Sequence, residues 1–130
     1  MDDIRAHIAH ERDIEVEGWG GIVSWRTLIS ADRTPTAGLT AGTADIEPGA
    51  TVDGALHHHA PHELYYFLAG CGHVHIDGAE HPVEAGSVVF VPGGTPHFVR
   101  NTGDEVLRLL YTFPVDSFTD VEYEFPDPRP

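Results

Sequence analysis

Turn-forming residues divide this chain into many short pieces, and this division restricts the fold more than any other feature of the sequence. The chain contains 14 glycines and 10 prolines, gathered in clusters such as EPGA, PGGTP and NTGDE. Glycine allows positive φ angles and proline fixes φ, so such clusters mark turns. Runs rich in valine, isoleucine, leucine and aromatic residues lie between them. Many short strands at nearly regular spacing are typical of an antiparallel sandwich or barrel.

Eight segments have this β character, and together they predict an all-β chain. They are residues 21–29, 38–46, 64–70, 72–78, 81–86, 87–92, 97–101 and 106–113. Residues 2–12 alone have helical spacing, with Ile4 and Ile8 four positions apart, so a short N-terminal helix is expected there. The length suits one compact domain over residues 1–130. The aromatic residues of 114–130 predict that this tail packs on the body of the domain.

Charge and composition argue against several classes of partner. The formal net charge is −14, and the sequence contains no lysine. Phosphate backbones and anionic membranes attract lysine and arginine, so neither nucleic acid nor a membrane is an expected partner. No apolar run reaches the roughly 18 residues of a membrane span. The charged N-terminus lacks a signal-peptide core and the single cysteine, Cys71, cannot form an internal disulfide, so a cytoplasmic location is expected.

The segment HHHAPHEL, residues 57–64, places four histidines and a glutamate in eight positions. Side chains alternate between the two faces of a strand, so His57 and His59 point the same way. In an extended chain, Glu63 and Tyr65 share that face. Two histidines and a carboxylate on an inner face suit a divalent transition metal, whereas the competing interpretation is polar surface.

Other polar residues have simpler interpretations, which stay open beside the ligand hypothesis. His58 and His62 point to the opposite face and are alternative ligands, although solvent exposure is the expected role. His73 and His75 share one face of the next strand, where they fit either a solvated surface or a hydrogen bond that orients a ligand. Asn101, in the cluster NTGDE, is expected to fix a turn.

Two spaced motifs resemble the paired signature of the cupin superfamily. The first, at about 49–70, reads His57-x-His59, three residues, Glu63, six residues and Gly70; the second, at about 86–101, reads Gly86, five residues, Pro92, one, Gly94, two, His97, three and Asn101. The second motif matches the family pattern throughout. In the first, Gly49 stands two positions farther from the first histidine than the family's glycine does. The resemblance implies a jelly-roll barrel, that is, a double-stranded β-helix.

The cupin resemblance also implies a ligand set for one metal. His57, His59, Glu63 and His97 stand at the ligand positions of the two motifs. They imply a divalent transition metal, either iron, manganese, nickel or zinc, with about two of its six octahedral positions open. A cupin that has kept the fold and lost the metal is the alternative.

The tail adds a resemblance to the small single-cupin dimethylsulfoniopropionate lyases. The segment FPVDSFTDVEY, residues 113–123, is similar to a Phe-Pro-x-Asp-x-Phe-x-x-Val-x-Tyr segment near the C-terminus of those enzymes. This resemblance covers about residues 19–126. It implies that Tyr65 and Tyr123 lie beside the metal and abstract a proton. A free phenol titrates near pH 10, and a nearby cation would make the phenolate available.

The function implied is a metal-dependent lyase that eliminates a β-substituent from a small carboxylate such as dimethylsulfoniopropionate and yields acrylate. Cupins host several activities, so three alternatives stay open: an iron-dependent dioxygenase, a metal-dependent isomerase or rearrangement enzyme, and a non-catalytic module that binds a small molecule. Small cupins also resemble one another in forming homodimers, which an exposed sheet edge would favour.

Overall fold

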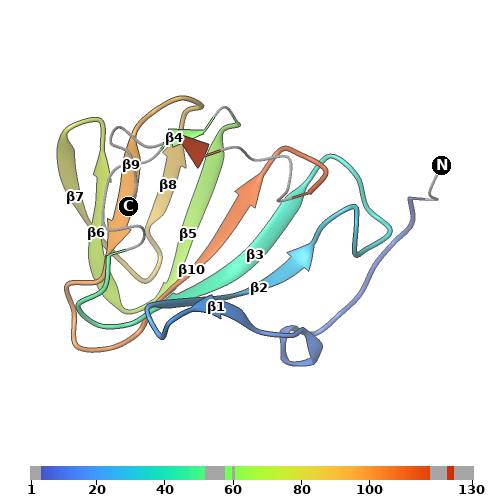
Figure 1. Ribbon diagram of the computed structural model, residues 1–130, viewed down its shortest axis with the longest axis horizontal. Helices are drawn as coiled ribbons and strands as arrows, with labels where there is room; N and C mark the ends of the chain where they lie inside the picture. The colour runs from blue at the N-terminus through green and yellow to red at the C-terminus, as the bar shows by residue number, and fades with distance from the viewer. Residues whose placement is uncertain (1–3, 52–57, 60, 118–122, 125–130) are drawn as a thin grey trace.

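Antiparallel pairing joins the strands of this computed structural model, which describes residues 4–51, 58–59, 61–117 and 123–124. The elements in chain order are η1 (Glu11–Asp13), β1 (Glu17–Trp19), β2 (Val23–Ile29), β3 (Thr40–Ile46), β4 (His58–His59), β5 (Glu63–Ala69), β6 (Cys71–Ile76), β7 (Ala79–Glu84), β8 (Val88–Val91), β9 (His97–Arg100), β10 (Leu107–Phe113) and β11 (Tyr123–Glu124). Figure 1 shows their arrangement. The predicted all-β class is confirmed.

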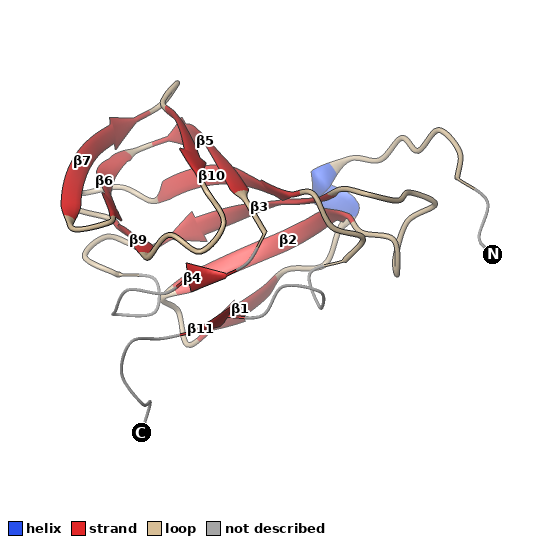
Figure 2. Cartoon of the chain, turned by 90° about the horizontal axis from the view of Figure 1, so that it is seen from above, coloured by secondary structure: helices blue, strands red, loops and turns tan. Residues whose placement is uncertain are grey.

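The described residues form three sheets. The long sheet has the order β1-β2-β3-β10-β5-β8, the short sheet has the order β7-β6-β9, and β11 pairs with β4. Neighbours such as β3, β10 and β5 are far apart in the sequence, as in a jelly roll. Figure 2 shows the short sheet curving over one end of the long sheet. Valines of the short sheet and aromatic residues of the long sheet belong to one buried cluster, so the two sheets share a core.

Strand alternation decides which side chains enter this core. In β5, Tyr65 and Phe67 are buried, whereas Tyr66 and Leu68 between and beyond them are exposed. In β10, every second residue from Leu107 to Phe113 is buried. The register sets Leu109 opposite Phe67. The expected inward orientation of Tyr65 is therefore confirmed.

The predicted N-terminal helix is wrong. Residues 4–10 have no regular structure, and η1 is a single 3-10 turn of three residues. Helices in proteins depend on packing of an apolar face, yet Ile4 and Ile8 are 71% and 96% exposed. The four-residue spacing of Ile4 and Ile8 is therefore not enough to form a helix. Within the described part of the chain, no helix is long and apolar enough to cross a membrane.

Asn101 closes the turn after β9, as predicted. Its buried amide donates to the carbonyl oxygens of Ile46 and Glu105, and its side-chain oxygen accepts a hydrogen bond from the backbone of Gly103. One side chain thus forms hydrogen bonds with three backbone groups. The last residue of the second motif has a structural role at the end of the barrel where β3 ends and β10 begins.

Candidate functional site

A carboxylate and an imidazole meet inside the barrel. Glu63 is the first residue of β5 in the long sheet, and His97 is the first residue of β9 in the short sheet. His97 is completely buried and Glu63 is 5% exposed. Nε2 of His97 lies 3.2 Å from Oε1 of Glu63. The structure therefore brings together two predicted ligands from different motifs.

The second ring nitrogen of His97 determines which atom faces the glutamate. Nδ1 lies 2.8 Å from the carbonyl oxygen of Thr95, which only accepts hydrogen bonds, so Nδ1 carries a proton. In a neutral imidazole, Nε2 then directs a lone pair toward the lone pairs of the Glu63 carboxylate. A proton or a metal cation is needed to offset this repulsion. Metal-binding histidines typically have such a hydrogen bond on the far nitrogen, so the pair fits a divalent transition metal.

The turn PGGTP explains why His97 enters the barrel in this orientation. Gly94 has a φ of 80°, a conformation that favours glycine, and the amide of Thr95 donates to the carbonyl of Pro92. This tight turn between β8 and β9 leaves the carbonyl of Thr95 beside the imidazole. The motif glycine and proline therefore position a ring nitrogen rather than contact a ligand themselves.

The alternative ligand His62 lies on the other side of the strand. It is exposed, its Nδ1 accepts a hydrogen bond from the backbone of Gly93 at 2.7 Å, and its ring lies 5.3 Å from that of Phe90. These contacts hold the imidazole on the outside of the sheet. The expectation that His62 is exposed is confirmed.

The remaining predicted ligands fall at the edge of what the structure describes. His57 lies outside the described residues. The backbone of His59 belongs to β4, and Tyr123 of β11 stands opposite it in the register. The two-stranded sheet thus joins a predicted ligand strand to the strand of the second predicted tyrosine. Among the side chains that are described, no three histidines, cysteines or acidic residues gather, so the full ligand set stays a prediction.

Tyr65 lies on the same inner face as Glu63. Its side chain is 6% exposed, and its ring centroid is 6.2 Å from that of His97. The alternation of β5 gives this placement, because Tyr65 is two residues beyond Glu63. The structure therefore brings the predicted catalytic phenol to the buried pair.

Tyr111 is a second inner-face phenol that sequence reasoning missed. It stands opposite Tyr65 on one side and opposite Gly42 on the other. Burial raises the pKa of Tyr111 to about 12, a hydrogen bond with Thr27 lowers it, and the charge of Glu63 raises it further. Alternation through LRLLYTF, the sequence of β10, was the signal that could have identified it as an inward residue.

The histidines of β6 lie outside the core. Val74 between them is fully buried, so His73 and His75 share the outer face. His75 stacks on Phe98 at 4.8 Å, and Nδ1 of His73 is 3.1 Å from the hydroxyl of Thr102. Both histidines are engaged at the surface, so of their two interpretations the solvated surface is the correct one.

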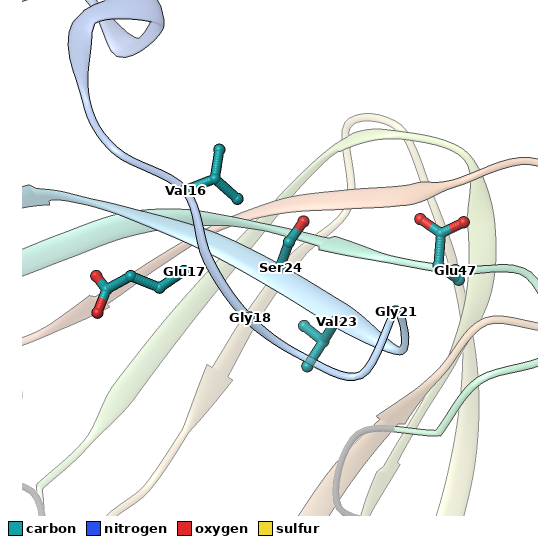
Figure 3. A pocket seen from close by; sticks show the side chains of 7 residues that line it. All are labelled: Val16, Glu17, Gly18, Gly21, Val23, Ser24 and Glu47. Carbon is teal, nitrogen blue, oxygen red and sulfur yellow. The ribbon is translucent and has the colours of Figure 1, made fainter.

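A surface groove of about 340 Å³ lies at the far end of the long sheet. Figure 3 shows its lining, which is Val16, Glu17, Gly18, Gly21, Val23, Ser24 and Glu47. Val23, which lines the groove, pairs with Ile46 at one end of β3. Leu64, next to Glu63, stands opposite Thr112 of β10, and Thr112 stands opposite Ala41 at the other end of β3. About six residues of strand, roughly 20 Å, separate the two places. This groove is therefore separate from the buried site.

The family follows from the sequence match. Residues 42–113, more than half of the chain, match the cupin domain family. The chain is a cupin. The matched span begins in β3, ends with β10 and contains both Glu63 and His97. The predicted family and the jelly-roll fold are therefore confirmed.

Two relatives of this cupin have names that refer to small carboxylates. It is 38% identical over 105 residues to the dimethylsulfoniopropionate lyase DddW of Ruegeria pomeroyi, covering 81% of this chain and 67% of that protein. It is 31% identical over 105 residues to an oxalate-binding protein of Thermotoga maritima, covering 81% and 86%. A crystal structure from Thermotoga maritima, described as a predicted oxalate decarboxylase, superposes with a TM-score of 0.73 at 27% identity, covering 84% and 99%.

Proposed function

We propose that this cupin is a metal-dependent lyase that eliminates a β-substituent from a small carboxylate, with dimethylsulfoniopropionate as the type of substrate. The contact between Glu63 and His97, buried in the barrel with the phenol of Tyr65 beside it, carries this proposal. The 38% identity to a dimethylsulfoniopropionate lyase supports the choice of reaction. A carbon–sulfur bond is the bond that breaks.

His57, His59, Glu63 and His97 would hold one divalent transition metal, either iron, manganese, nickel or zinc. The donor set supports this, because one nitrogen of His97 and one oxygen of Glu63 already converge in an apolar interior, and both atoms have lone pairs that can bind a metal. A buried carboxylate and imidazole are costly unless they are paired or bind a metal. When bound, the metal supplies Lewis-acid stabilisation of the negative charge that develops on the substrate carboxylate.

Tyr65 would act as the base in this proposal. Its phenolate oxygen accepts the proton from the α-carbon, and the C–H electron pair forms the double bond to the β-carbon. The carbon–sulfur bond breaks and its electrons leave with dimethyl sulfide, so the products are acrylate and a protonated Tyr65. Proton transfer by a positioned side chain typically contributes 10²–10⁴-fold, on the order of the effect expected here.

The rest of the interior would protect the reaction. Phe67, Val91 and Phe113 are buried on the same inner face and exclude water from the base. Tyr111, beside Tyr65, keeps its proton because burial raises its pKa to about 12, so it is not the base. Tyr123 is the remaining candidate phenol, and the register of β11 with β4 supports a place near the ligand strand.

Oxalate binding or decarboxylation is the second candidate function. The oxalate-binding relative favours it, because the match covers 86% of that protein's length. A small dicarboxylate needs the same metal but no base positioned at an α-carbon, so Tyr65 would have no proton to remove. The two candidates therefore differ in their dependence on Tyr65.

Anaerobic incubation of the purified protein, loaded in turn with each metal, separates these functions. With dimethylsulfoniopropionate we expect dimethyl sulfide in the headspace and acrylate in solution in equal amounts. Conversion of oxalate to formate and carbon dioxide, without release of dimethyl sulfide, would select the second candidate. Turnover of neither substrate without oxygen would reject the lyase and the oxygen-independent decarboxylase, and would leave oxalate binding or an oxygen-dependent reaction.

A further inference from the structure

The tail that follows β10 leaves the long sheet at the end where the buried pair lies. Phe113, the last residue of β10, stands opposite Thr40, the first residue of β3. The residue before it, Thr112, stands opposite Leu64, the neighbour of Glu63. The tail therefore starts at the same end of the sheet as the carboxylate that is a proposed metal ligand.

Three hydrogen bonds fasten the start of the tail to the loop between β2 and β3. The amide of Ala31 donates to the backbone carbonyl of Asp116 at 2.6 Å, and the buried hydroxyl of Thr40 donates to the backbone carbonyl of Val115 at 2.9 Å. The amide of Gly38 donates to the carboxylate of Asp116 at 2.7 Å. We name these five residues the tail anchor. The carboxylate of Asp116 is the one acceptor in it that a substitution can remove.

The loop that supplies these donors is held by hydrogen bonds of its own. The amide and the hydroxyl of Thr34 both donate to the carbonyl oxygen of Ser30, at 2.7 and 2.9 Å. Ser30 itself is 1% exposed. Gly38 has a φ of 78°, a left-handed conformation that favours glycine. The loop is therefore a support that keeps its shape by local contacts, and the tail is the segment that it holds.

The far end of the described tail supports a strand with a proposed ligand. Five residues separate Ser117, which is 7% exposed, from Tyr123, the first residue of β11. The strand β11 pairs with β4, where Tyr123 stands opposite His59 (Figure 1). Among the strands that the structure describes, β4 pairs with β11 alone. The backbone of His59 therefore receives its described strand pairing from the tail.

Such a short ribbon needs outside support. The strands β4 and β11 have two residues each, and an isolated two-stranded ribbon is marginally stable at best. With the anchor in place, five residues connect Ser117 to β11; without it, nine residues connect Phe113 to β11. A longer free connection costs more entropy to close. Loss of the anchor should therefore weaken the pairing of β11 with β4.

We propose that Asp116 is a positioning residue for the metal site: its carboxylate holds the tail, the tail holds β4, and β4 holds His59. This role rests on the proposed function, in which His59 is a metal ligand. Asp116 is exposed and acts through the backbone of the tail, not as a ligand. The aspartate of the segment FPVDSFTDVEY thereby has a structural role that its position in the sequence does not reveal.

Hydrogen–deuterium exchange of the metal-free protein tests the anchor without any metal. In Asp116→Ala, peptides that contain His58–His59 or Tyr123–Glu124 should exchange about tenfold faster than in the wild type, as expected for the loss of one hydrogen bond to a charged group. Peptides of β5 and β10 should be unchanged. Equal exchange in Asp116→Ala and the wild type, or acceleration over the whole barrel, would overturn the proposal.

Two further variants separate the hydrogen bond from the charge and from the loop. Asp116→Asn removes the charge but keeps an oxygen that accepts from Gly38, so it should exchange as the wild type does. Asp32→Ala is the matched control, because it removes a carboxylate of the same loop that contacts the hydroxyl of Ser30 and not the tail. Acceleration in either variant that equals the acceleration in Asp116→Ala would overturn the role of this hydrogen bond.

Thr40→Val tests the anchor from its other side. The substitution removes the hydroxyl that donates to Val115 and keeps a branched side chain at a completely buried position. The same two peptides, those of β4 and β11, should exchange faster while that of β5 does not change. Wild-type exchange of both peptides in Thr40→Val would contradict an anchor at this end of the tail.

Metal affinity distinguishes a failure of this role from a failure of the proposed function. Titration with zinc against a competing chelator should show one site in the wild type and a site roughly tenfold weaker in Asp116→Ala, because groups that orient a ligand typically contribute 10–100-fold to metal affinity. Asp116→Asn and Asp32→Ala should match the wild type. Equal affinity in Asp116→Ala and the wild type would overturn the role of Asp116 alone. A wild type that binds no metal would overturn the ligand set and this role together.

Discussion

Tyr65 and Tyr111 lie directly opposite each other on neighbouring strands, yet their surroundings differ. Tyr65 has the imidazole of His97 on one side, with ring centroids 6.2 Å apart. Tyr111 extends over Gly42, where an added Cβ would overlap its hydroxyl, and it interacts with Thr27. Of these two tyrosines, Tyr65 is the one whose ring lies beside that of His97, so the two are expected to respond differently to substitution.

Replacement of Tyr65 by phenylalanine should remove turnover without loss of the metal. The phenol is the proposed base but not a ligand, so the rate of dimethyl sulfide release should fall by about 10²–10⁴-fold. Metal content, measured by elemental analysis, should equal that of the wild type. Tyr66→Phe is the control, because Tyr66 points outward and should keep the wild-type rate. An unchanged rate in Tyr65→Phe would transfer the role of base to Tyr123.

Replacement of His97 by alanine should abolish metal retention. His97 contributes a buried nitrogen that faces Glu63. After gel filtration the variant should contain only traces of metal, while its circular dichroism should show a folded β protein. The comparison is His75→Ala, which removes an imidazole stacked on the outer surface and should retain the metal. Full occupancy in His97→Ala would mean that the ligand set is wrong.

Glu11 links the N-terminal segment to the sheet in a pH-dependent way. The hydroxyl of Thr43 and the guanidinium of Arg108 hold the pKa of Glu11 below its ordinary value, against the opposing effect of burial. A lowered pKa contributes stability that is fully present above the unfolded pKa and is lost as the pH falls through the folded pKa. Glu11→Gln should therefore lower the free energy of unfolding by about 1 kcal/mol at pH 7.

Urea unfolding at pH 7 and at pH 4 checks this prediction for Glu11. The difference between wild type and Glu11→Gln should begin to shrink at pH 4, because the carboxylate of the unfolded wild type begins to gain a proton there while that of the folded state stays ionised. Glu84→Gln, at an exposed position of β7, should match the wild type at both pH values. A difference that is the same at pH 7 and pH 4 would contradict an ionic role for Glu11.

Tyr111 should make the folded protein sensitive to alkaline pH. Burial raises the pKa of Tyr111 to about 12, so the folded state keeps a proton that the unfolded state loses near pH 10. The contribution of this group is complete below pH 10 and is lost as the pH rises toward 12. Between pH 9 and 11 the wild type should lose about 1 kcal/mol more of its unfolding free energy than Tyr111→Phe does. A Tyr66→Phe variant should follow the wild type; equal slopes for all three would contradict the prediction.

Much of the inner face could be predicted from the sequence. Strand alternation alone places Glu63 and Tyr65 inward and Tyr66 outward, because a strand with one buried face has a period of two. Strand alternation could not predict the contact of Glu63 with His97, because their strands lie in different sheets. The resemblance of the two motifs to the cupin signature predicted that Glu63 and His97 belong to one site. No pattern within a single strand predicts it.

The missed features depend on tertiary contacts. The spacing of Ile4 and Ile8 suggested a helix, but both side chains stay exposed, and spacing without packing does not make a helix. Tyr111 lay in a strand that was predicted correctly, yet its neighbours Gly42 and Thr27 come from two other strands. Its raised pKa results from those neighbours and from burial, which the sequence of one strand does not contain.

Metal titration of the chelator-treated protein, with dimethyl sulfide release followed at each addition, tests most directly whether the buried centre makes this cupin a lyase. We predict that one equivalent of metal binds per chain and that turnover rises in proportion to bound metal until that equivalent is reached. Turnover that does not change with added metal, or one bound equivalent of each metal without release of dimethyl sulfide, would contradict the proposed function.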